Sequence, residues 1–501
     1  MCATQKKEGF IIILNRLNYL LFFIVFQIMF LRAEFQPFVR GAFIPDLKVK
    51  GDDYTVLMAV DAKRSEGLVP SQGNSHAKFY LTGWRQPKQH VAWRVHVAEP
   101  GDYAIHVLLR QKSSVPLRLE VTADHKALVA QLAPEARNWQ RVSLEGVFSL
   151  TSGPHELSLC LAGTGHADFE AEVHAIELVR PAVRAALHQK ALALRAETTW
   201  FQQARYGIMV HWTNETMPLQ GELKAYDQAV KEFNVEQFAD DMQKTGAGFV
   251  VFTTSHGAHY FPAPLASLDK ILPGRTARRD LVADLADALV KRGMKLFLYY
   301  HLGSQADSAW TKASGFWDTD TTPFFNNWQA LITEAGERYG TKLAGWWFDD
   351  GAVNYYYRSA PWEKLARAAK AGFPQRLVGF NAWELNSPTE FMDYFTGEGF
   401  HEPQGYNRLI TPDCNGRYPS GTHAGLQSSA CLIAEEEWGH FTRRTTFGRL
   451  RWNAEQLTDV LKHFIALKNV PIFNLEITQE GRVSPMTVEL FQQVSANLLL
   501  Q

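Results

Sequence analysis

The sequence predicts a multidomain chain in which an N-terminal β-sandwich precedes a (β/α)8-type barrel. The chain has 501 residues, enough for two or three domains, and its 46% hydrophobic and 21% charged residues are ordinary for a globular protein. Short alternating segments fill residues 44–181, whereas apolar runs alternate with helical segments over residues 205–501. This change of rhythm indicates two architectures in one chain.

Residues 1–33 have the composition of an export signal. Two lysines precede an apolar stretch whose most hydrophobic part, 19–31, is too short for a comfortable membrane span. Cleavage after Ala33 would release the mature chain, and the alternative is an uncleaved anchor that uses residues 10–31. Both interpretations predict an exported protein, which would be periplasmic, bound to the cell surface or secreted.

The sandwich is predicted from alternation. Segments such as WRVHV (93–97) and YAIHVLL (103–109) place apolar side chains at every second position, as expected for strands with one buried face. Turn signals such as EPGD and TSGPH recur at short, regular intervals, which favours two packed antiparallel sheets. The order of the strands resembles carbohydrate-binding modules of the jelly-roll type, so this domain either binds glycan or only supports its neighbour.

Residues 182–204 are rich in Ala and Leu at helical spacing and predict a helical linker. After them, apolar runs such as YGIMV, VVFTTS, LFLYY and LAGWWF alternate with helical segments. Repeated βα units over this length favour a (β/α)8-type barrel over an open doubly wound sheet. No G-x-G-x-x-G motif or P-loop follows these strands, so a nucleotide cofactor has no support.

The charge balance argues against several classes of partner. Lys and Arg number 51 and Asp and Glu number 52, which leaves a formal charge of -1 and no overall basic field for nucleic acid. The 12% aromatic content, with 14 Trp, suits a protein that stacks the flat faces of sugars. We expect an oligosaccharide or polysaccharide glycan as the partner.

Polar residues close five apolar strands of the predicted barrel. Enzymes with this fold place their active sites at the carboxyl ends of the strands, so these residues are the first candidates for a site. A single one could equally be a structural residue, but five strand ends together are more convincing. The residues are His211, His256, His301, Asp349 with Asp350, and Asn381.

The segment GWWFDD ends in two acids, and alternation selects one of them. Adjacent strand residues point to opposite faces, so Asp349 shares a face with Trp347. Asp350 shares the other face with Trp346 and Phe348, an apolar surface suited to outer helices. We therefore expect Asp349 in the barrel mouth and Asp350 in the next turn. A carboxylate among histidines and Trp rings suits glycoside hydrolysis, in which a second carboxyl group protonates the leaving oxygen.

Residues from about 199 to the C-terminus resemble the α-L-fucosidases of glycoside hydrolase family 29. The segments WFQQARYGIMVHW, TGAGFVVFTTSHGAHYF, LFLYYHL, LAGWWFDDG and VPIFNLEI follow the family's motifs in the same order, LFLYYHL standing beside G-L-Y-Y-S-L. The resemblance implies a retaining double displacement on α-linked fucose with Asp349 as the nucleophile and no metal or organic cofactor. It also implies sugar contacts from His211, Trp212 and His256, to which we add Trp347 as a stacking surface.

The chain departs from the family's pattern at two places. The motif H-H-D-G is His256-Gly257-Ala258-His259 here, so one sugar-contacting histidine is absent unless His259 takes its place. Ser429 stands where the motif that ends near Trp438 has Glu. These departures leave open a hydrolase of another sugar or of internal bonds in fucose-rich polysaccharide, and a catalytically silent carbohydrate-binding protein.

The proton donor is harder to predict, because its position varies within the family. The segment DYFTGEGF resembles the family's D-F-x-T-P-E, which makes Glu398 the first candidate. A retaining pair would stand roughly 5 Å apart and an inverting pair roughly 6.5–9.5 Å apart. A metal site of His211, His256 and His259 is a minor alternative, since no acidic ligand follows at a recognised spacing. The competing acids are Glu384, Glu435, Glu436 and Glu437.

Overall fold

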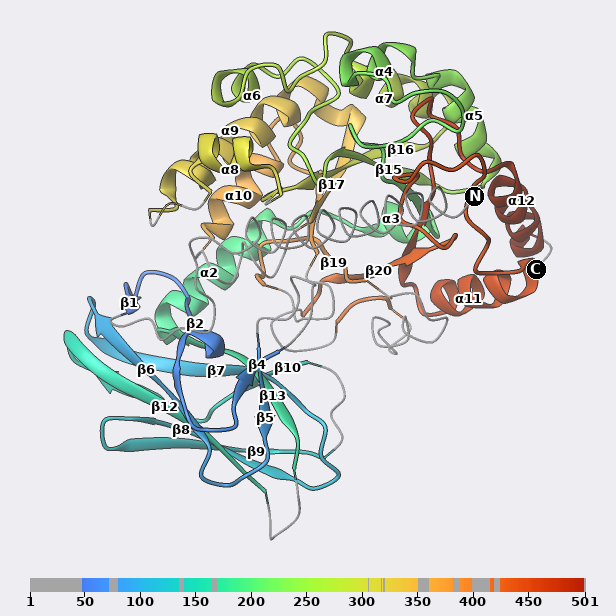
Figure 1. The fold of residues 1–501 in the computed structure, drawn as a ribbon. Helices are drawn as coiled ribbons and strands as arrows, with labels where there is room; N and C mark the ends of the chain where they lie inside the picture. The colour runs from blue at the N-terminus through green and yellow to red at the C-terminus, as the bar shows by residue number, and fades with distance from the viewer. Residues whose placement is uncertain are drawn as a thin grey trace, which may run out of the picture.

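The computed structural model describes residues 47–71, 80–134, 139–163, 169–304, 306–316, 318, 320–349, 360–381, 388–398, 415–418 and 424–499. The predicted export segment 1–33, Asp350 and Glu384 lie outside these residues. None of the described helices is long and apolar enough to cross a membrane. A region of two β-sheets comes first along the chain, and an eight-stranded barrel follows it (Figure 1).

The N-terminal region consists of two sheets whose strands pair mostly antiparallel. One has the order β1 (Leu47–Val49), β6 (His90–Val97), β12 (Gly153–Gly163), β8 (Leu117–Ala123) and β9 (Lys126–Leu132), with β3 (Lys63–Arg64) on β6. The other has the order β10 (Gln140–Ser143), β7 (Gly101–Gln111), β13 (Ala171–Val179), β5 (Leu81–Trp84) and β4 (Val69–Pro70), with β11 (Phe148–Leu150) on β7 and β2 (Thr55–Met58) on β13. Alternate residues of β6 and β7, such as Val95, Ile105 and Val107, are buried, as the sequence pattern predicts.

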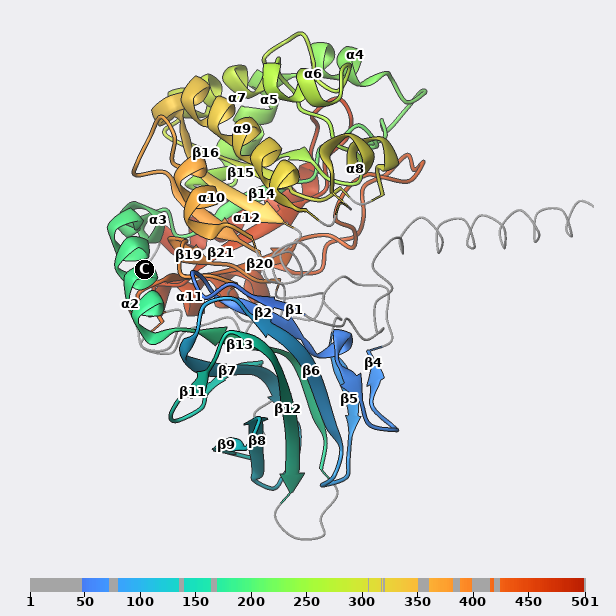
Figure 2. The same cartoon turned by 90° about the vertical axis from the view of Figure 1, so that its left-hand side faces the viewer.

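Two helices, rather than one, connect the sheets to the barrel. They are α2 (Pro181–Leu194) and α3 (Thr199–Gln203). Figure 2 shows α2 along the side of the barrel, where Lys190 forms an ion pair of 2.8 Å with Glu363. The ring of Phe201 in α3 stacks on Phe297 with centroids 5.8 Å apart, so this short helix closes the amino-terminal end of the barrel interior.

The barrel has eight parallel strands in chain order. They are β14 (Gly207–Val210), β15 (Phe249–Ser255), β16 (Lys295–His301), β17 (Leu343–Asp349), β18 (Leu377–Phe380), β19 (Tyr394–Phe395), β20 (Gln427–Ile433) and β21 (Val470–Leu475). β21 pairs with β14, and an isolated parallel bridge between Asn381 and Thr396 joins β18 to β19. The predicted barrel is therefore confirmed, although the sequence analysis did not find the two-residue strand β19.

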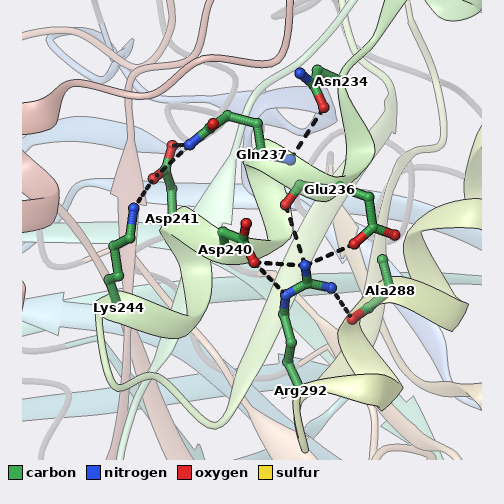
Figure 3. Close-up of polar contacts among 8 residues, drawn as sticks. All are labelled: Asn234, Glu236, Gln237, Asp240, Asp241, Lys244, Ala288 and Arg292. Carbon is green, nitrogen blue, oxygen red and sulfur yellow. Dashed lines mark hydrogen bonds and ion pairs between the residues drawn. The ribbon is translucent and has the colours of Figure 1, made fainter.

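Helices surround the barrel in Figure 1. They are α4 (Tyr226–Glu232), α5 (Val235–Lys244), α6 (Ala266–Ile271), α7 (Leu281–Lys291), α8 (Ser308–Ser314), α9 (Thr322–Tyr339), α10 (Trp362–Ala369), α11 (Ala454–Ala466) and α12 (Pro485–Leu499). Asn234 caps α5 by accepting a hydrogen bond of 3.1 Å from the Gln237 backbone N–H. Arg292, just after α7, forms ion pairs with Asp240 and Glu236 of α5 at 2.6 and 2.7 Å (Figure 3). These two neighbouring helices are thus tied together at the surface.

The two faces of β17 follow the predicted alternation only from Gly345 onward. The register against β16 shifts between Leu343 and Gly345, and this irregularity puts Leu343 with the outer core and Ala344 with the inner one. A Cβ atom on Gly345 would lie 2.4 Å from the Phe297 ring, so glycine is required there. Beyond Gly345, Trp347 packs inside the barrel, whereas Trp346 and Phe348 belong to the outer core.

Candidate active site at the carboxyl ends of the strands

Asp349 is the last residue of β17 and its side chain is held from two neighbouring strands. The hydroxyl of Tyr299 in β16 donates a hydrogen bond to Oδ2. Nδ2 of Asn381, directly after β18, donates to Oδ1 at 2.9 Å. Asp349 is only 8% exposed. Because each carboxylate oxygen has two lone pairs, both oxygens stay able to react while these donors fix the orientation of the group.

Glu398 lies close to Asp349, because the side-chain amide of Asn381 donates a hydrogen bond to each of them. The backbone of Glu398 forms a parallel bridge with Cys431 of β20, and its Oε1 accepts a hydrogen bond of 2.7 Å from Nδ2 of Asn381. Burial, together with the charges of Glu398 and Asp349, raises the pKa of the Cys431 thiol well above its ordinary value. The predicted catalytic pair is thus brought together at the carboxyl ends of β17 and β19.

His211 follows β14 and is fixed in one tautomer by its hydrogen bonds. Nδ2 of Asn474 donates to the carbonyl of Trp438 at 2.7 Å, so Oδ1 of Asn474 faces His211 Nδ1 at 2.6 Å as an acceptor. We therefore assign the proton of the neutral ring to Nδ1, and Nε2 keeps a lone pair. Burial lowers the pKa of His211 to about 4, helped by the nearby His256.

A β-bulge in β15 brings His256 to the same group. Thr253 pairs with Tyr299, but Ser255 pairs with Tyr300, so one extra residue enters β15. Bulges of this kind re-aim side chains beside active sites. The ring of His256 consequently lies 5.5 Å from that of His211. Burial lowers the pKa of His256, so this imidazole is also predominantly neutral near neutral pH.

His256, His301 and Asp349 form the one group found among the described residues whose side chains could hold a metal ion. One ligand atom from each lies within 4.8 Å of the others. Imidazoles and a carboxylate suit zinc chemically. Tyr299 and Asn381 each donate a hydrogen bond to one oxygen of Asp349, an arrangement that also suits the positioning of a reactive carboxylate.

The structure does not place His259 beside His256, His301 and Asp349. Its ring stacks on Trp310 with centroids 3.5 Å apart, its Nε2 lies 2.7 Å from the Tyr300 hydroxyl, and its backbone N–H donates to Asp307. Tyr300 belongs to the outer core, so His259 lies behind the sheet rather than in the barrel mouth. Burial lowers the pKa of His259 well below its ordinary value. Its contacts are those of a structural residue.

The two predicted tryptophans also lie outside the open part of the mouth. Trp212 packs against Phe233 in the outer core, and its Nε1 donates to the carbonyl of Gln479 at 3.0 Å. Trp347 is inside the barrel, stacked on Tyr299 with centroids 5.0 Å apart. It is only 1% exposed, so it is a packing partner of Tyr299 rather than an open stacking surface.

Two of the competing acids, Glu435 and Glu436, are bound to partners other than Asp349. Glu435 is fully buried, its Oε1 accepts from the Thr487 hydroxyl in α12 and its Oε2 from the backbone N–H of Glu476. Burial raises the pKa of Glu435 to about 8. Glu436 forms an ion pair with Arg449 at the surface, and Glu437 is exposed.

Two residues of the site were missed as functional candidates from sequence. Tyr299 has the same parity as His301 in LFLYYH, a signal that alternation alone could have given. Asn474 is the penultimate residue of the apolar strand β21, and its contacts to His211 and to the Trp438 carbonyl are seen only in the structure. The rings of Tyr299 and Trp438 lie 4.9 and 5.3 Å from that of His211, so the mouth is lined with aromatic surface.

A separate cavity of about 600 Å³ lies on the outside of the barrel. Of the residues named above for the site, it is lined by Phe233, the packing partner of Trp212, and not by Asp349 or the residues around it. Its walls come from α4, α5, α7 and the segments beside them, and Arg279 closes one side by donating to the carbonyls of Val230 and Phe233 at the end of α4.

Comparison with known proteins identifies the family of the chain. Residues 224–499, more than half of the chain, match the family described as Alpha-L-fucosidase. Tissue alpha-L-fucosidase of Bos taurus is 30% identical over 138 residues, which are 21% of this chain and 29% of that protein. The Homo sapiens protein of the same name is 27% identical over 192 residues, 31% of this chain and 39% of that protein. The matched parts thus span well under half the length of these relatives.

Solved structures with a similar fold include alpha-L-fucosidases. The enzyme AlfC from Lactobacillus casei, in complex with alpha-L-fucose product, has a TM-score of 0.45 and 17% identity over 60% of this chain and 97% of its own. An alpha-L-fucosidase of family GH29 from Bacteroides thetaiotaomicron has a TM-score of 0.43 and 14% identity over 61% of this chain and 74% of its own.

Proposed function

Because the chain belongs to the alpha-L-fucosidase family, we propose that it is a glycoside hydrolase that removes α-linked L-fucose from glycans with retention of configuration. One observation carries the proposal: Nδ2 of Asn381 donates hydrogen bonds to both Asp349 and Glu398. The two bonds, 2.9 and 2.7 Å long, limit the bound oxygens to at most 5.6 Å, the sum of the two. With the amide hydrogens 120° apart the separation is about 4.9 Å, close to the roughly 5–5.5 Å of retaining pairs.

In the proposed reaction, the protonated carboxyl group of Glu398 gives its proton to the glycosidic oxygen while an oxygen of Asp349 attacks the anomeric carbon. The bond to the leaving group breaks and a covalent fucosyl ester forms on Asp349. Glu398, now ionised, takes a proton from water, and the water oxygen attacks the same carbon and releases Asp349. Two inversions at the anomeric carbon give net retention.

The surrounding groups suit a neutral sugar. His211 is neutral near pH 7, because burial lowers its pKa to about 4, and its Nε2 can accept a hydrogen bond from a sugar hydroxyl. Tyr299 and Asn381 orient Asp349 so that little reorganisation is needed when charge moves onto the sugar ring. The expected partners are therefore fucosylated oligosaccharides or polysaccharides.

The test of the nucleophile compares two adjacent acids in the full chain. Wild type, Asp349→Asn and Asp350→Asn are assayed on nitrophenyl α-L-fucoside, and NMR identifies the anomer that is formed first. We expect retention in the wild type and a loss of about 10⁴-fold or more in kcat only in Asp349→Asn. An inverted product would refute the double displacement, and a dead Asp350→Asn with an active Asp349→Asn would refute the assignment.

The test of the proton donor uses the acidity of the leaving group. Glu398→Gln should keep most of its kcat/KM on a fucoside with an acidic phenol leaving group, which departs without protonation, but lose it on a fucosyl oligosaccharide. Its kcat should fall on both substrates, because no ionised Glu398 takes the proton from water in the second step. Glu436→Gln is the control, since Glu436 pairs with Arg449 at the surface and should behave as wild type on both. Equal losses of kcat/KM on both substrates in Glu398→Gln would assign Glu398 another role.

A second candidate function is hydrolysis of another sugar by the same carboxylates. It is favoured by one observation: Gly257 follows His256 where the family's motif has a second histidine, and His259 is held by Trp310. A lower kcat/KM on α-L-fucosides than on α-galactosides or on fucose-rich polysaccharide would select it. Binding of glycans without turnover of any of them would instead identify a silent carbohydrate-binding protein.

We also propose that the protein is exported, because residues 1–33 have the composition of a signal segment. Cell fractionation of the full chain tests this. We expect it outside the cytoplasm, and recovery only from the cytoplasm would refute export.

A further inference from the structure

His301 stands at the edge of the proposed active site without a role in the chemistry given above. It ends β16 and pairs in register with Asp349 of β17. It has the same parity as Phe297 and Tyr299, which pack inside the barrel, so its side chain belongs to the interior face. The ring lies 5.3 Å from that of His256 and is only 9% exposed. His301 is therefore close enough to the nucleophile to contact the same sugar ring.

The hydrogen bonds of His301 define which of its nitrogens can donate. The backbone N–H of Ser304 donates to Nδ1 of His301 at 3.0 Å. Nδ1 therefore accepts, and in the neutral ring the proton is on Nε2. This is the opposite tautomer to His211, whose Nδ1 is the donor to Asn474. Nε2 of His211 is therefore a hydrogen-bond acceptor, whereas Nε2 of His301 is a donor.

The backbone conformation and hydrogen bonds of Ser304 stabilise this tautomer of His301. Its φ of 41° lies in the left-handed region, which a residue other than glycine seldom adopts. Its hydroxyl donates to the carbonyl of His256 at 2.8 Å while its N–H binds His301. A strained backbone that persists with two such bonds is held by its surroundings, and such strain gathers at functional sites. One residue thereby fixes His301 relative to His256.

We propose that Nε2 of His301 donates a hydrogen bond to a ring hydroxyl of the bound sugar and so helps to determine which sugar is accepted. The inference rests on the proposed function. It is supported by the sequence: the loop position next to His256 is Gly257 where the motif H-H-D-G has histidine, and His301 stands where the motif G-L-Y-Y-S-L has serine. The chain therefore lacks the second histidine of the motif in the loop after β15 and has a histidine, His301, at the end of the neighbouring strand β16.

The experiment separates the proposed contact from the support of the loop. In His301→Asn, the amide oxygen can replace Nδ1 and accept from the Ser304 N–H, but nothing replaces the Nε2 donor. In His301→Gln, the longer side chain can place an N–H near the former Nε2 position. Both variants and wild type are assayed as full chains on nitrophenyl α-L-fucoside and on its 2-deoxy, 3-deoxy and 4-deoxy analogues, with thermal unfolding as a check of folding.

We expect the wild type to lose about 5- to 100-fold in kcat/KM on the analogue that lacks the contacted hydroxyl. His301→Asn should lose a similar factor on the parent fucoside and show no further loss on that analogue, whereas His301→Gln should recover part of the discrimination. If His301→Asn does not fold, His301→Ser, which introduces the residue of the motif, replaces it.

A folded His301→Asn or His301→Ser with the deoxy-sugar discrimination of wild type would overturn the role of His301 while leaving the proposed function intact. A wild type that hydrolyses none of the α-L-fucosides would overturn the proposed function, and the role of His301 with it.

Discussion

Asn381 offers the sharpest test of the site, because a single amide group holds both carboxylates. In Asn381→Ala the bonds of 2.9 Å to Asp349 and 2.7 Å to Glu398 are both lost. A hydrogen bond to an ionised group contributes about 1.5–3 kcal/mol and one to a neutral group about 0.5–1.5 kcal/mol. With Asp349 ionised and Glu398 protonated, the loss is about 2–4.5 kcal/mol, which corresponds to a roughly 30- to 2,000-fold lower kcat/KM.

The isosteric variant Asn381→Asp distinguishes donation from simple filling of space. It keeps the shape of the side chain but puts a third acid between two others, so we expect it to be at least as slow as Asn381→Ala. Asn469→Ala is the matched control, since Asn469 is also buried and its Nδ2 donates to the Leu467 carbonyl away from the site. The control should lower the thermal midpoint and leave kcat/KM within about twofold of wild type.

The assay is kcat/KM on nitrophenyl α-L-fucoside together with the thermal midpoint of each variant. If Asn381→Asp keeps more activity than Asn381→Ala, or if a folded Asn381→Ala stays within threefold of wild type, the bridging amide is not what positions the carboxylates.

Three further predictions concern pH, metal and local stability. Burial lowers the pKa of His106 and His174 to about 3 and that of His211 to about 4, so the unfolded chain binds protons before the folded one. The stability that these histidines contribute should be complete above about pH 6.5 and fall as the pH drops toward 4, by up to about 1.4 kcal/mol per pH unit and histidine. Between about pH 4.5 and 8 the raised pKa of Glu435, about 8, has the opposite effect and offsets roughly one histidine. Urea unfolding at pH 7 and 5 measures this, and equal midpoints would contradict it. Dialysis against EDTA should leave turnover unchanged, because two carboxyl groups perform the chemistry, and a loss restored by zinc would contradict that. Asn234→Ala removes the cap of α5 and should lower the unfolding free energy by about 1 kcal/mol, whereas an unchanged urea midpoint would show that the cap adds little.

Alternation predicted which side chains face the barrel interior best where the strands are regular. Asp349 could be chosen over Asp350 because β17 alternates without interruption from Gly345 to its end. Strict alternation fails at the start of β17. The irregularity there places Leu343 on the outer face of the sheet and Ala344 on the inner face, the reverse of what alternation predicts. Alternation would also have aimed Ser255 rather than His256 into the barrel, because the bulge in β15 leaves no mark in the sequence.

Other features depended on partners that a sequence does not reveal. β19 has only two residues, too few for any periodicity, and it exists because the strands on either side offer hydrogen bonds. His259 follows His256 by three residues, and this spacing in a loop does not predict where the His259 side chain points. Stacking on the ring of Trp310 determines its position. Glu398 was found through a motif rather than from a pattern of burial.

The bridge between Asn381 and Thr396 joins β18 to β19, and this pair of strands is the seam of the barrel. The side chain of Asn381 also holds the two carboxylates. Any local opening at this seam would therefore separate Asp349 from Glu398 while the remaining strands stay paired. Heating should then abolish turnover at a temperature below the global unfolding transition, and cooling should restore it. Amide hydrogen exchange at Asp393, whose backbone N–H donates to the Val378 carbonyl of β18 at 2.8 Å, would then follow the same curve as the loss of activity.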